Sequence, residues 1–232
     1  MKSVEHNTDD DFRNMDPWRM FRIMAEFVDG FEQMAKLGRG VSIFGSARTP
    51  EGHPYYEMAR ETARQLSLAG FNIITGGGPG IMEAANRGAR ESGKGTTVGL
   101  NIDLPFEQSS NPYIQKLLNF RYFFVRKVMF SKYSRAIVTM PGGFGTLDEF
   151  FENLTLVQTC KIPQMPLVLM GTKYWGGMLT WIKESMEVED KMISPGDMDL
   201  VKVTDDPAEA VAYIIENLKL DSGQRGTPAP EE

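Results

Sequence analysis

The chain has 232 residues, of which 41% are hydrophobic and 24% are charged, and its formal net charge is −6 at neutral pH. This length and composition are typical of a globular protein with one large core. The negative charge argues against a protein whose main task is to bind the nucleic-acid backbone, so we expect no nucleic-acid partner. It does not exclude a small anionic ligand, which backbone N–H groups can hold on an acidic protein.

Metal and membrane functions have little support in the residues. Cys160 is the only cysteine, so an intrachain disulfide or a cysteine metal cluster is excluded, and two histidines are too few for most histidine metal sites. The N-terminus is polar and has no apolar segment typical of a signal peptide. No apolar run approaches the roughly 20 residues that span a bilayer. We therefore expect a cytoplasmic protein without metal and without a membrane partner.

The two ends of the chain differ from the rest. Residues 1–15 are polar, and we interpret them as a disordered arm. From Asp16, a cap followed by Pro17, apolar side chains recur every three or four residues and predict an amphipathic helix over 16–37. Its aromatic stripe suits a core or a subunit interface better than a ligand site. Residues 219–232 contain few apolar side chains, which predicts a mobile tail.

Between these ends, short β-branched runs alternate with helical patterns. The runs predict strands at 41–44, 71–75, 96–102, 117–124, 135–140, 165–171 and 200–204. The helical patterns lie at 55–68, 81–92, 124–133, 146–159, 175–187 and 207–218. This alternation predicts one α/β domain over 16–218, a Rossmann-like, doubly wound parallel sheet flanked by helices with an extra N-terminal helix. Ligands of such sheets bind at the carboxyl ends of the strands.

Three glycine loops follow predicted strands at that edge. They are "FGSAR" (44–48), "TGGGPG" (75–80) and "MPGGFGT" (140–146). Glycine lets the backbone approach a ligand closely, and the free N–H groups of a following helix attract anions. Two of the three loops precede a helix, which favours phosphate or nucleotide binding. The candidate binding residues are Gly45, Ser46, Gly76, Gly77, Gly78, Gly80, Gly142, Gly143, Gly145 and Thr146.

Familiar cofactor motifs do not fit these loops. The segment 88–95, "GARESGKG", has Gly95 where a P-loop needs Ser or Thr, and it ends a predicted helix. The dinucleotide fingerprint would need glycine at Ile81 or Glu83, so NAD and FAD are disfavoured. Neither histidine lies near a nucleophile elbow, so a Ser-His-Asp hydrolase is unsupported.

Charged residues beside the third loop allow two interpretations each. If Thr146 caps the helix, Glu149 completes a capping box and needs no further explanation. Alternatively, Glu149 works on ribose hydroxyls or on water near a developing oxocarbenium ion. Arg126 and Lys127 lie in "RYFFVRKVMF" (121–130). They either extend from a packed helix into solvent, or Arg126 reaches the cleft at the strand ends and balances the charge of a substrate.

Together these segments resemble a known family. "PGGFGTLDE" (141–149) is similar to the PGGxGTxxE signature of the LONELY GUY (LOG) proteins, which are cytokinin-activating phosphoribohydrolases. "FFVRK" (123–127) stands where that family has an Arg-Lys pair, and 44–48 and 75–89 resemble its first two ligand loops. The resemblance covers 41–218 and is to the longer bacterial branch. The shorter branch has MHxRK where this chain has "FFVRK", so base preference cannot be carried over.

The resemblance implies hydrolysis of the N-glycosidic bond of a purine nucleoside 5′-monophosphate, as in an AMP nucleosidase, to free base and ribose 5-phosphate. It leaves open whether the base is adenine, prenylated adenine or another. It assigns Arg126 and Glu149 as the catalytic pair and Gly142, Gly143, Gly145 and Thr146 to the 5′-phosphate. The remaining candidate residues, with Lys127, would line the rest of the site. No metal or organic cofactor is implied.

The family also implies a homodimer or higher homo-oligomer with the site near the interface. This would suit the apolar side chains of Phe150, Phe151 and Leu154, for which packing within one subunit is the alternative.

Two other functions stay open, because fold does not fix function. One is a non-catalytic nucleotide or molybdenum-cofactor carrier, and the other is a nucleotide sensor that uses the N-terminal helix for partners. A pure binder has no chemical need for Arg126 together with Glu149. Members of this family are often labelled lysine decarboxylases. In this chain no lysine stands in a recognisable pyridoxal-phosphate setting, so the residues do not support that label.

Overall fold

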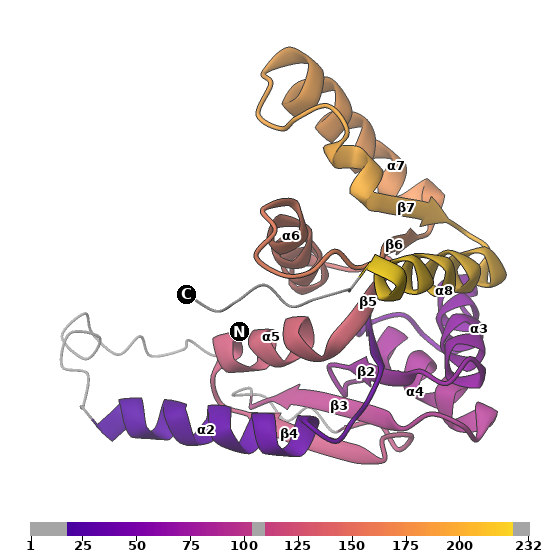
Figure 1. Cartoon of the computed structure of the whole chain (residues 1–232). Coiled ribbons are helices and arrows are strands. Elements are labelled where there is room, and N and C mark those ends of the chain that lie inside the picture. The colour runs from indigo at the N-terminus through magenta and orange to yellow at the C-terminus, as the bar shows by residue number, and fades with distance from the viewer. Residues whose placement is uncertain (1–17, 104–109, 225–232) are drawn as a thin grey trace, which may run out of the picture.

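The computed structural model describes residues 18–103 and 110–224 (Figure 1). The predicted polar arm 1–15, Asp16, Pro17 and the last part of the predicted tail lie outside the described residues. The helix of the N-terminal segment, α2 (Trp18–Met34), is present. The last helix, α8 (Pro207–Gln224), extends six residues beyond the end expected at 218.

The described residues form a seven-stranded sheet in which all neighbouring strands are parallel. Its order is β4-β3-β2-β1-β5-β6-β7. The strands are β1 (Gly40–Phe44), β2 (Asn72–Thr75), β3 (Thr97–Ile102), β4 (Lys116–Phe120), β5 (Ser134–Thr139), β6 (Leu167–Met170) and β7 (Val201–Thr204). The order reverses between β1 and β5, which is where a doubly wound sheet opens its ligand crevice. The predicted α/β Rossmann-like fold is confirmed.

Helices cover both faces of the sheet (Figure 1). The remaining elements are α3 (Pro54–Leu68), α4 (Ile81–Ser92), α5 (Phe123–Tyr133), α6 (Phe144–Gln158), α7 (Thr172–Trp181), the π-helix η1 (Ile182–Glu189) and the 3₁₀ helix η2 (Asp197–Leu200). Apolar side chains of α3, α4 and α8 form the core on one face, and those of α2 and α5 form it on the other. Strand β1 contributes to both, because Val41 and Ile43 point to the first core and Phe44 to the second.

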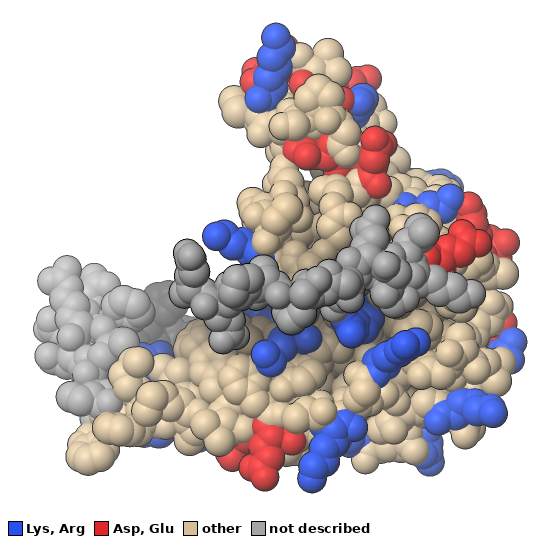
Figure 2. Space-filling model, viewed as in Figure 1, with Lys and Arg blue, Asp and Glu red and all other residues tan. Residues whose placement is uncertain are grey.

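A helical arm made of α7 and η1 extends from the top of the sheet in Figure 1. The sequence predicted one helix over 175–187, whereas α7 changes into a π-helix at Ile182. In Figure 2 the charged side chains of this arm lie at its tip and along its lower edge, and the surface over α6 below it is mostly uncharged. The arm contributes Trp175 to a third apolar cluster, with Phe150 of α6.

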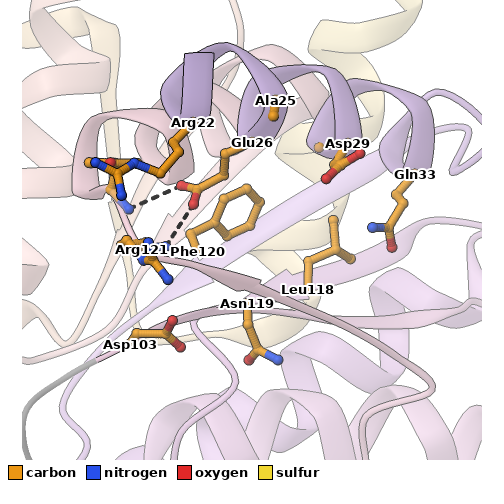
Figure 3. Close-up of a pocket in the computed structure, with 12 residues that line it drawn as sticks. Arg22, Ala25, Glu26, Asp29, Gln33, Asp103, Leu118, Asn119, Phe120 and Arg121 are labelled. Carbon is orange, nitrogen blue, oxygen red and sulfur yellow. Dashed lines mark hydrogen bonds between the residues drawn. The ribbon is translucent and has the colours of Figure 1, made fainter. Parts of the chain in front are cut away.

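One predicted strand is too long. The apolar run 117–124 was expected to be extended throughout, but β4 ends at Phe120 and α5 begins at Phe123. The reason is tertiary. Glu26 of α2 accepts hydrogen bonds from the backbone N–H groups of Arg121 and Tyr122, each at 3.0 Å, just before α5 (Figure 3). A carboxylate at this position stabilises the start of a helix, so α2 fixes where α5 begins.

Candidate active site

The three glycine loops meet at the carboxyl edge of the sheet. Ser46, after β1, donates its backbone N–H to the Pro141 carbonyl at 3.0 Å, and its own carbonyl accepts from Ile81 N–H at 3.0 Å. Ser46 therefore joins the first loop to both of the others. Beside it opens a cavity of about 940 Å³, at the point where the strand order reverses. The predicted position of the site at the strand ends agrees with this geometry.

The cavity gathers most of the predicted site residues. Those that line it are Gly45, Ser46, Gly76, Arg126, Gly142, Gly143, Gly145, Thr146 and Glu149. Four others do not line it: Gly77, Gly78, Gly80 and Lys127. The two sets of residues therefore differ in what they can do for a ligand.

The glycines of the 75–80 loop that lie outside the lining have structural roles. The carbonyls of Gly77 and Gly78 accept hydrogen bonds from the buried Asn111 side chain, at 3.2 and 3.0 Å. Gly80 has φ +69°, and a Cβ there would lie 2.4 Å from the Ser46 carbonyl oxygen. Glycine at position 80 is thus required by the backbone conformation and by its contact with the first loop.

The 140–146 loop is arranged differently. A Cβ on Gly143 or Gly145 would meet no atom within 4 Å, and neither residue has a positive φ. Neither contacts nor conformation therefore require glycine at these two positions. Without side chains, the backbone there is open to a ligand, and Gly143 has no side chain with which to cap α6. The first N–H groups of α6 stay available to an anion at the cavity wall.

The capping-box interpretation of Thr146 and Glu149 is wrong. Helix α6 begins at Phe144, two residues earlier than predicted, with Gly143 as its N-cap. Thr146 is instead the third helical residue and folds over Gly142, where a Cβ would lie 2.1 Å from the Thr146 hydroxyl oxygen. Glu149 lies in the second turn, and its carboxylate does not cap the helix.

Glu149 is the most unusual side chain of the cavity. It is only 4% exposed, and among the described residues neither of its carboxylate oxygens has a hydrogen-bond partner. Burial raises its pKa from 4.5 to about 7, against the opposing effects of Arg126 and Lys127. A buried carboxylate without hydrogen-bond partners costs folding free energy, and such costs are typical of functional sites.

Arg126 of α5 lies opposite Glu149. Its Nη2 is 3.8 Å from Glu149 Oε1, which is an ion pair but too long for a hydrogen bond. The guanidinium carbon lies 5.2 Å from the centre of the Phe123 ring and 5.7 Å from that of Phe130. Burial lowers the pKa of Arg126, and the charges of Glu149 and Asp148 act in the opposite direction. For both Arg126 and Glu149, burial changes the pKa more than the ion pair does, so neither charge is fully compensated by the other.

Sequence reasoning missed several residues of the cavity. Tyr174 of α7 donates its hydroxyl hydrogen to the Gly142 carbonyl at 2.7 Å and lines the cavity wall. Arg48 and His53, from the loop after β1, and Asn101, from β3, also line it. Nothing in the local sequence marks Tyr174, because its contact depends on how α7 packs against the loop after β5.

Comparison with protein families gives one clear match. Residues 82–214, more than half of the chain, match the family described as "Possible lysine decarboxylase". The chain belongs to this family. It is the family that contains the LOG proteins, so the resemblance seen in the sequence is confirmed.

Its relatives include named enzymes. The chain is 26% identical over 180 residues to a cytokinin riboside 5′-monophosphate phosphoribohydrolase of Rhodococcoides fascians, covering 76% of this chain and 89% of the relative. It is 23% identical over 151 residues to a probable enzyme of the same name from Arabidopsis thaliana, covering 64% and 75%.

Among solved structures, a molybdenum cofactor carrier protein of Chlamydomonas reinhardtii aligns with a TM-score of 0.56 and 27% identity, over 78% of this chain and 97% of that one. A molybdenum cofactor binding protein of Rippkaea orientalis aligns with the same TM-score at 20% identity, over 78% and 96%. The second match shows a shared fold alone.

The family description does not fit the cavity. A decarboxylase that uses pyridoxal phosphate needs a lysine to hold the cofactor as a Schiff base. None of the described residues that line the cavity is a lysine. Within 18–103 and 110–224, no three His, Cys, Asp or Glu side chains are placed to hold a metal ion. No helix in these ranges combines the length and apolar content needed to cross a bilayer.

Proposed function

We propose that this protein hydrolyses the N-glycosidic bond of a purine nucleoside 5′-monophosphate, releasing free base and ribose 5-phosphate. The observation that carries this proposal is Glu149, a buried carboxylate whose two oxygens have no hydrogen-bond partner among the described residues, beside a glycine loop with open backbone. The named relatives support the reaction class. The candidate substrates are AMP, an AMP with a prenylated base, and another purine nucleoside monophosphate.

The open glycines suit the 5′-phosphate. The N–H groups at the start of α6, next to Gly143 and Gly145, offer hydrogen bonds and the positive end of the helix dipole. Glu149, one turn further along, then faces the sugar rather than the phosphate. This spacing avoids the repulsion that a carboxylate in direct contact with phosphate would suffer.

The chemistry needs charge of both signs in this cavity. The bond from C1′ of ribose to N9 of the base breaks and its electron pair leaves on the base, while a water oxygen bonds to C1′. One proton leaves the water, and the departing base takes up a proton. Glu149 stabilises the positive charge on the ribose and, with a pKa of about 7, accepts the proton of the water. Arg126 supplies positive charge for the phosphate or for the departing base.

The test is to incubate the protein with AMP and with isopentenyladenosine monophosphate and to follow free base and ribose 5-phosphate by chromatography. Glu149→Gln is the active-site variant. Glu216→Gln, on the exposed surface of α8, is the matched control. Base release that only Glu149→Gln abolishes supports the proposal, and the ratio of rates ranks the substrates.

The second candidate is a non-catalytic nucleotide or molybdenum-cofactor carrier, because a named carrier aligns at 27% identity. A carrier would retain intact nucleotide or cofactor without releasing base. Tight retention without hydrolysis in the same assay would therefore favour the carrier.

We also propose a homodimer or higher homo-oligomer. Two phenylalanine side chains that line the cavity remain exposed, Phe144 at 91% and Phe123 at 51%, and Phe124, next to Phe123 in the chain, is 47% exposed. Phe150 does not belong to this exposed set, because it is buried against Leu169 and Trp175. For Phe150 the alternative, packing within one subunit, is confirmed. Light scattering in solution tests the assembly, and a monomer at micromolar concentration would contradict it.

A further inference from the structure

Polar contacts bind α5 to α6 along the seam that carries the proposed catalytic pair. At the cavity end, Arg126 faces Glu149. A neighbouring residue of each helix is joined too, because Lys127 Nζ lies 2.9 Å from Asp148 Oδ1 and 3.2 Å from Glu152 Oε2. A single ammonium thus joins two carboxylates on successive turns of α6.

A second contact extends this seam away from the cavity. The Ser131 hydroxyl of α5 is 3.0 Å from Asn153 Oδ1 of α6, and Asn153 Nδ2 donates to the backbone carbonyl of Glu149 at 2.8 Å. Lys127 and Ser131 are four residues apart, as are Glu149 and Asn153, so the contacts follow one face of each helix. Two polar contacts therefore join α5 to α6 on either side of Glu149, and the second includes its backbone carbonyl.

Lys127 itself does not reach the substrate cavity. Its side chain is only 18% exposed and is absent from the cavity lining, although the sequence placed it among the substrate-binding residues. Its two partners satisfy its charge within the seam. A partly buried ion pair with two carboxylates restricts motion more than an isolated surface pair does.

We propose that Lys127 is a positioning residue, whose ammonium joins α5 to α6 and holds Arg126 opposite Glu149 at a separation that leaves both Glu149 oxygens free for substrate. This inference rests on the proposed function. If the seam loosened, Arg126 and Glu149 would change their separation, and a change of about 1 Å in such a pair can lower a rate by roughly 10²-fold.

The charges around Glu149 support this arrangement. On α5, Arg126 and Lys127 lower its pKa, and on α6 Glu152 and Asp148 raise it. Arg48 and His53 line the same cavity from the loop after β1. Without Lys127, the two acidic neighbours on α6 would be uncompensated, so the pKa of Glu149 would rise further.

The experiment compares Lys127→Met, Lys127→Arg and the double variant Asp148→Asn/Glu152→Gln in steady-state hydrolysis of AMP. Lys127→Met should lower kcat about 10- to 100-fold with KM nearly unchanged, because the loss is one of orientation. Lys127→Arg should recover most of the rate. The double variant keeps the lysine but removes its anchors, and it should lower kcat as Lys127→Met does. Lys132→Met, on the exposed side of the same helix, is the control.

A pH profile adds a measurement that a role in folding alone would not affect. In Lys127→Met, the limb of the kcat/KM profile assigned to Glu149 should move to higher pH. A large rise in KM with unchanged kcat would overturn the proposal and assign Lys127 to phosphate binding. Wild-type kinetics for the double variant would overturn it as well. Should Lys127→Met not fold, as judged by circular dichroism, the double variant decides.

Failure of the proposed function can be told apart from failure of this inference. If the wild-type protein releases no base from any nucleoside monophosphate, the proposed function fails. Carbon-13 NMR of the Glu149 carboxyl, assigned with Glu149→Gln, then tests the seam without activity. A higher apparent pKa of Glu149 in Lys127→Met supports the contact between the helices, and an unchanged pKa overturns it.

Discussion

The two glycine loops that lead into helices, 75–80 before α4 and 140–146 before α6, have similar sequences and different surroundings. In the first, Gly80 needs its positive φ and its close contact with Ser46, and the carbonyls of Gly77 and Gly78 hold Asn111. In the second, Gly143 and Gly145 face open space.

The acids that follow the two loops differ in the same way. Glu83, in the first turn of α4, accepts a hydrogen bond from the Tyr56 hydroxyl at 3.0 Å. Glu149 has no hydrogen-bond partner among the described residues and lies in the cavity wall. A glycine-rich turn before a helix therefore has two uses. It can hold loops together or leave backbone free for a ligand, and only the surroundings distinguish the two.

The largest expected effect is on the rate of base release, and it distinguishes Glu149 from Glu83. Glu149→Gln should lower base release by about 10²- to 10⁴-fold, because it removes the proton acceptor and the negative charge beside the ribose. Glu83→Gln should leave the rate close to that of the wild type, because Glu83 lies outside the cavity lining. Steady-state kinetics with AMP measure both. Equal losses in the two variants would show that the loops are not divided in this way.

The next effect is on stability and depends on pH. Burial raises the pKa of folded Glu149 from 4.5 to about 7, so the folded state binds the proton more tightly than the unfolded state. Its contribution to stability is then fully present below about pH 4.5 and is lost as pH rises to about 7. The free energy of unfolding of wild type minus that of Glu149→Gln should fall over this range by up to about 3 kcal/mol. Urea denaturation at several pH values measures it, and a flat difference would contradict the shift.

Glycine substitutions test the loops themselves. Gly80→Ala should lower the free energy of unfolding by about 2 kcal/mol, since alanine at positive φ is strained and its Cβ would collide with the Ser46 carbonyl. Gly143→Ala should change stability by less than about 1 kcal/mol, because the space around it is open, while raising KM for the nucleotide. Denaturation and kinetics on both variants provide the check. A stable Gly80→Ala protein, or an unchanged KM for Gly143→Ala, would break the comparison.

The smallest expected effect concerns Tyr174, which contacts the 140–146 loop at the cavity wall. Tyr174→Phe removes the hydrogen bond to the Gly142 carbonyl and should raise KM by a factor corresponding to about 1 kcal/mol. Tyr213→Phe on α8, outside the cavity lining, is the control. A Tyr174→Phe protein with the wild-type KM would show that the loop holds its shape without α7.

Much of the fold could be predicted because its signals are local. Helix α4 has the predicted bounds, 81–92, because Gly80 and Gly93 end the pattern on either side. The seven strands follow short apolar runs, and alternation with helices predicts a parallel sheet. The end of β4 and the start of α6 were misjudged. Glu26, on a helix distant in sequence, determines where β4 ends. Gly143 is the N-cap of α6 and forms no side-chain capping bond, so it gives no local signal for the start of that helix.

The residues of the candidate site also divide into those with a local sequence signal and those whose role depends on tertiary contacts. Arg126 and Glu149 were identified from a motif, and the structure places them 3.8 Å apart across the seam between α5 and α6. The place of Lys127 in that seam, outside the cavity, was not predictable, because its partners Asp148 and Glu152 lie on the other helix. Tyr174 carried no signal for the same reason.

The sequence by itself determined the class of fold, the edge of the sheet where the loops lie, and the family, because hydrophobic periodicity and glycine punctuation act over a few residues. Only the tertiary structure decided which glycines are open, which acid is buried without a hydrogen bond, and which cation faces the cavity. These properties depend on burial and on contacts between segments far apart in the chain, and such contacts exist only once the sheet and its helices have packed.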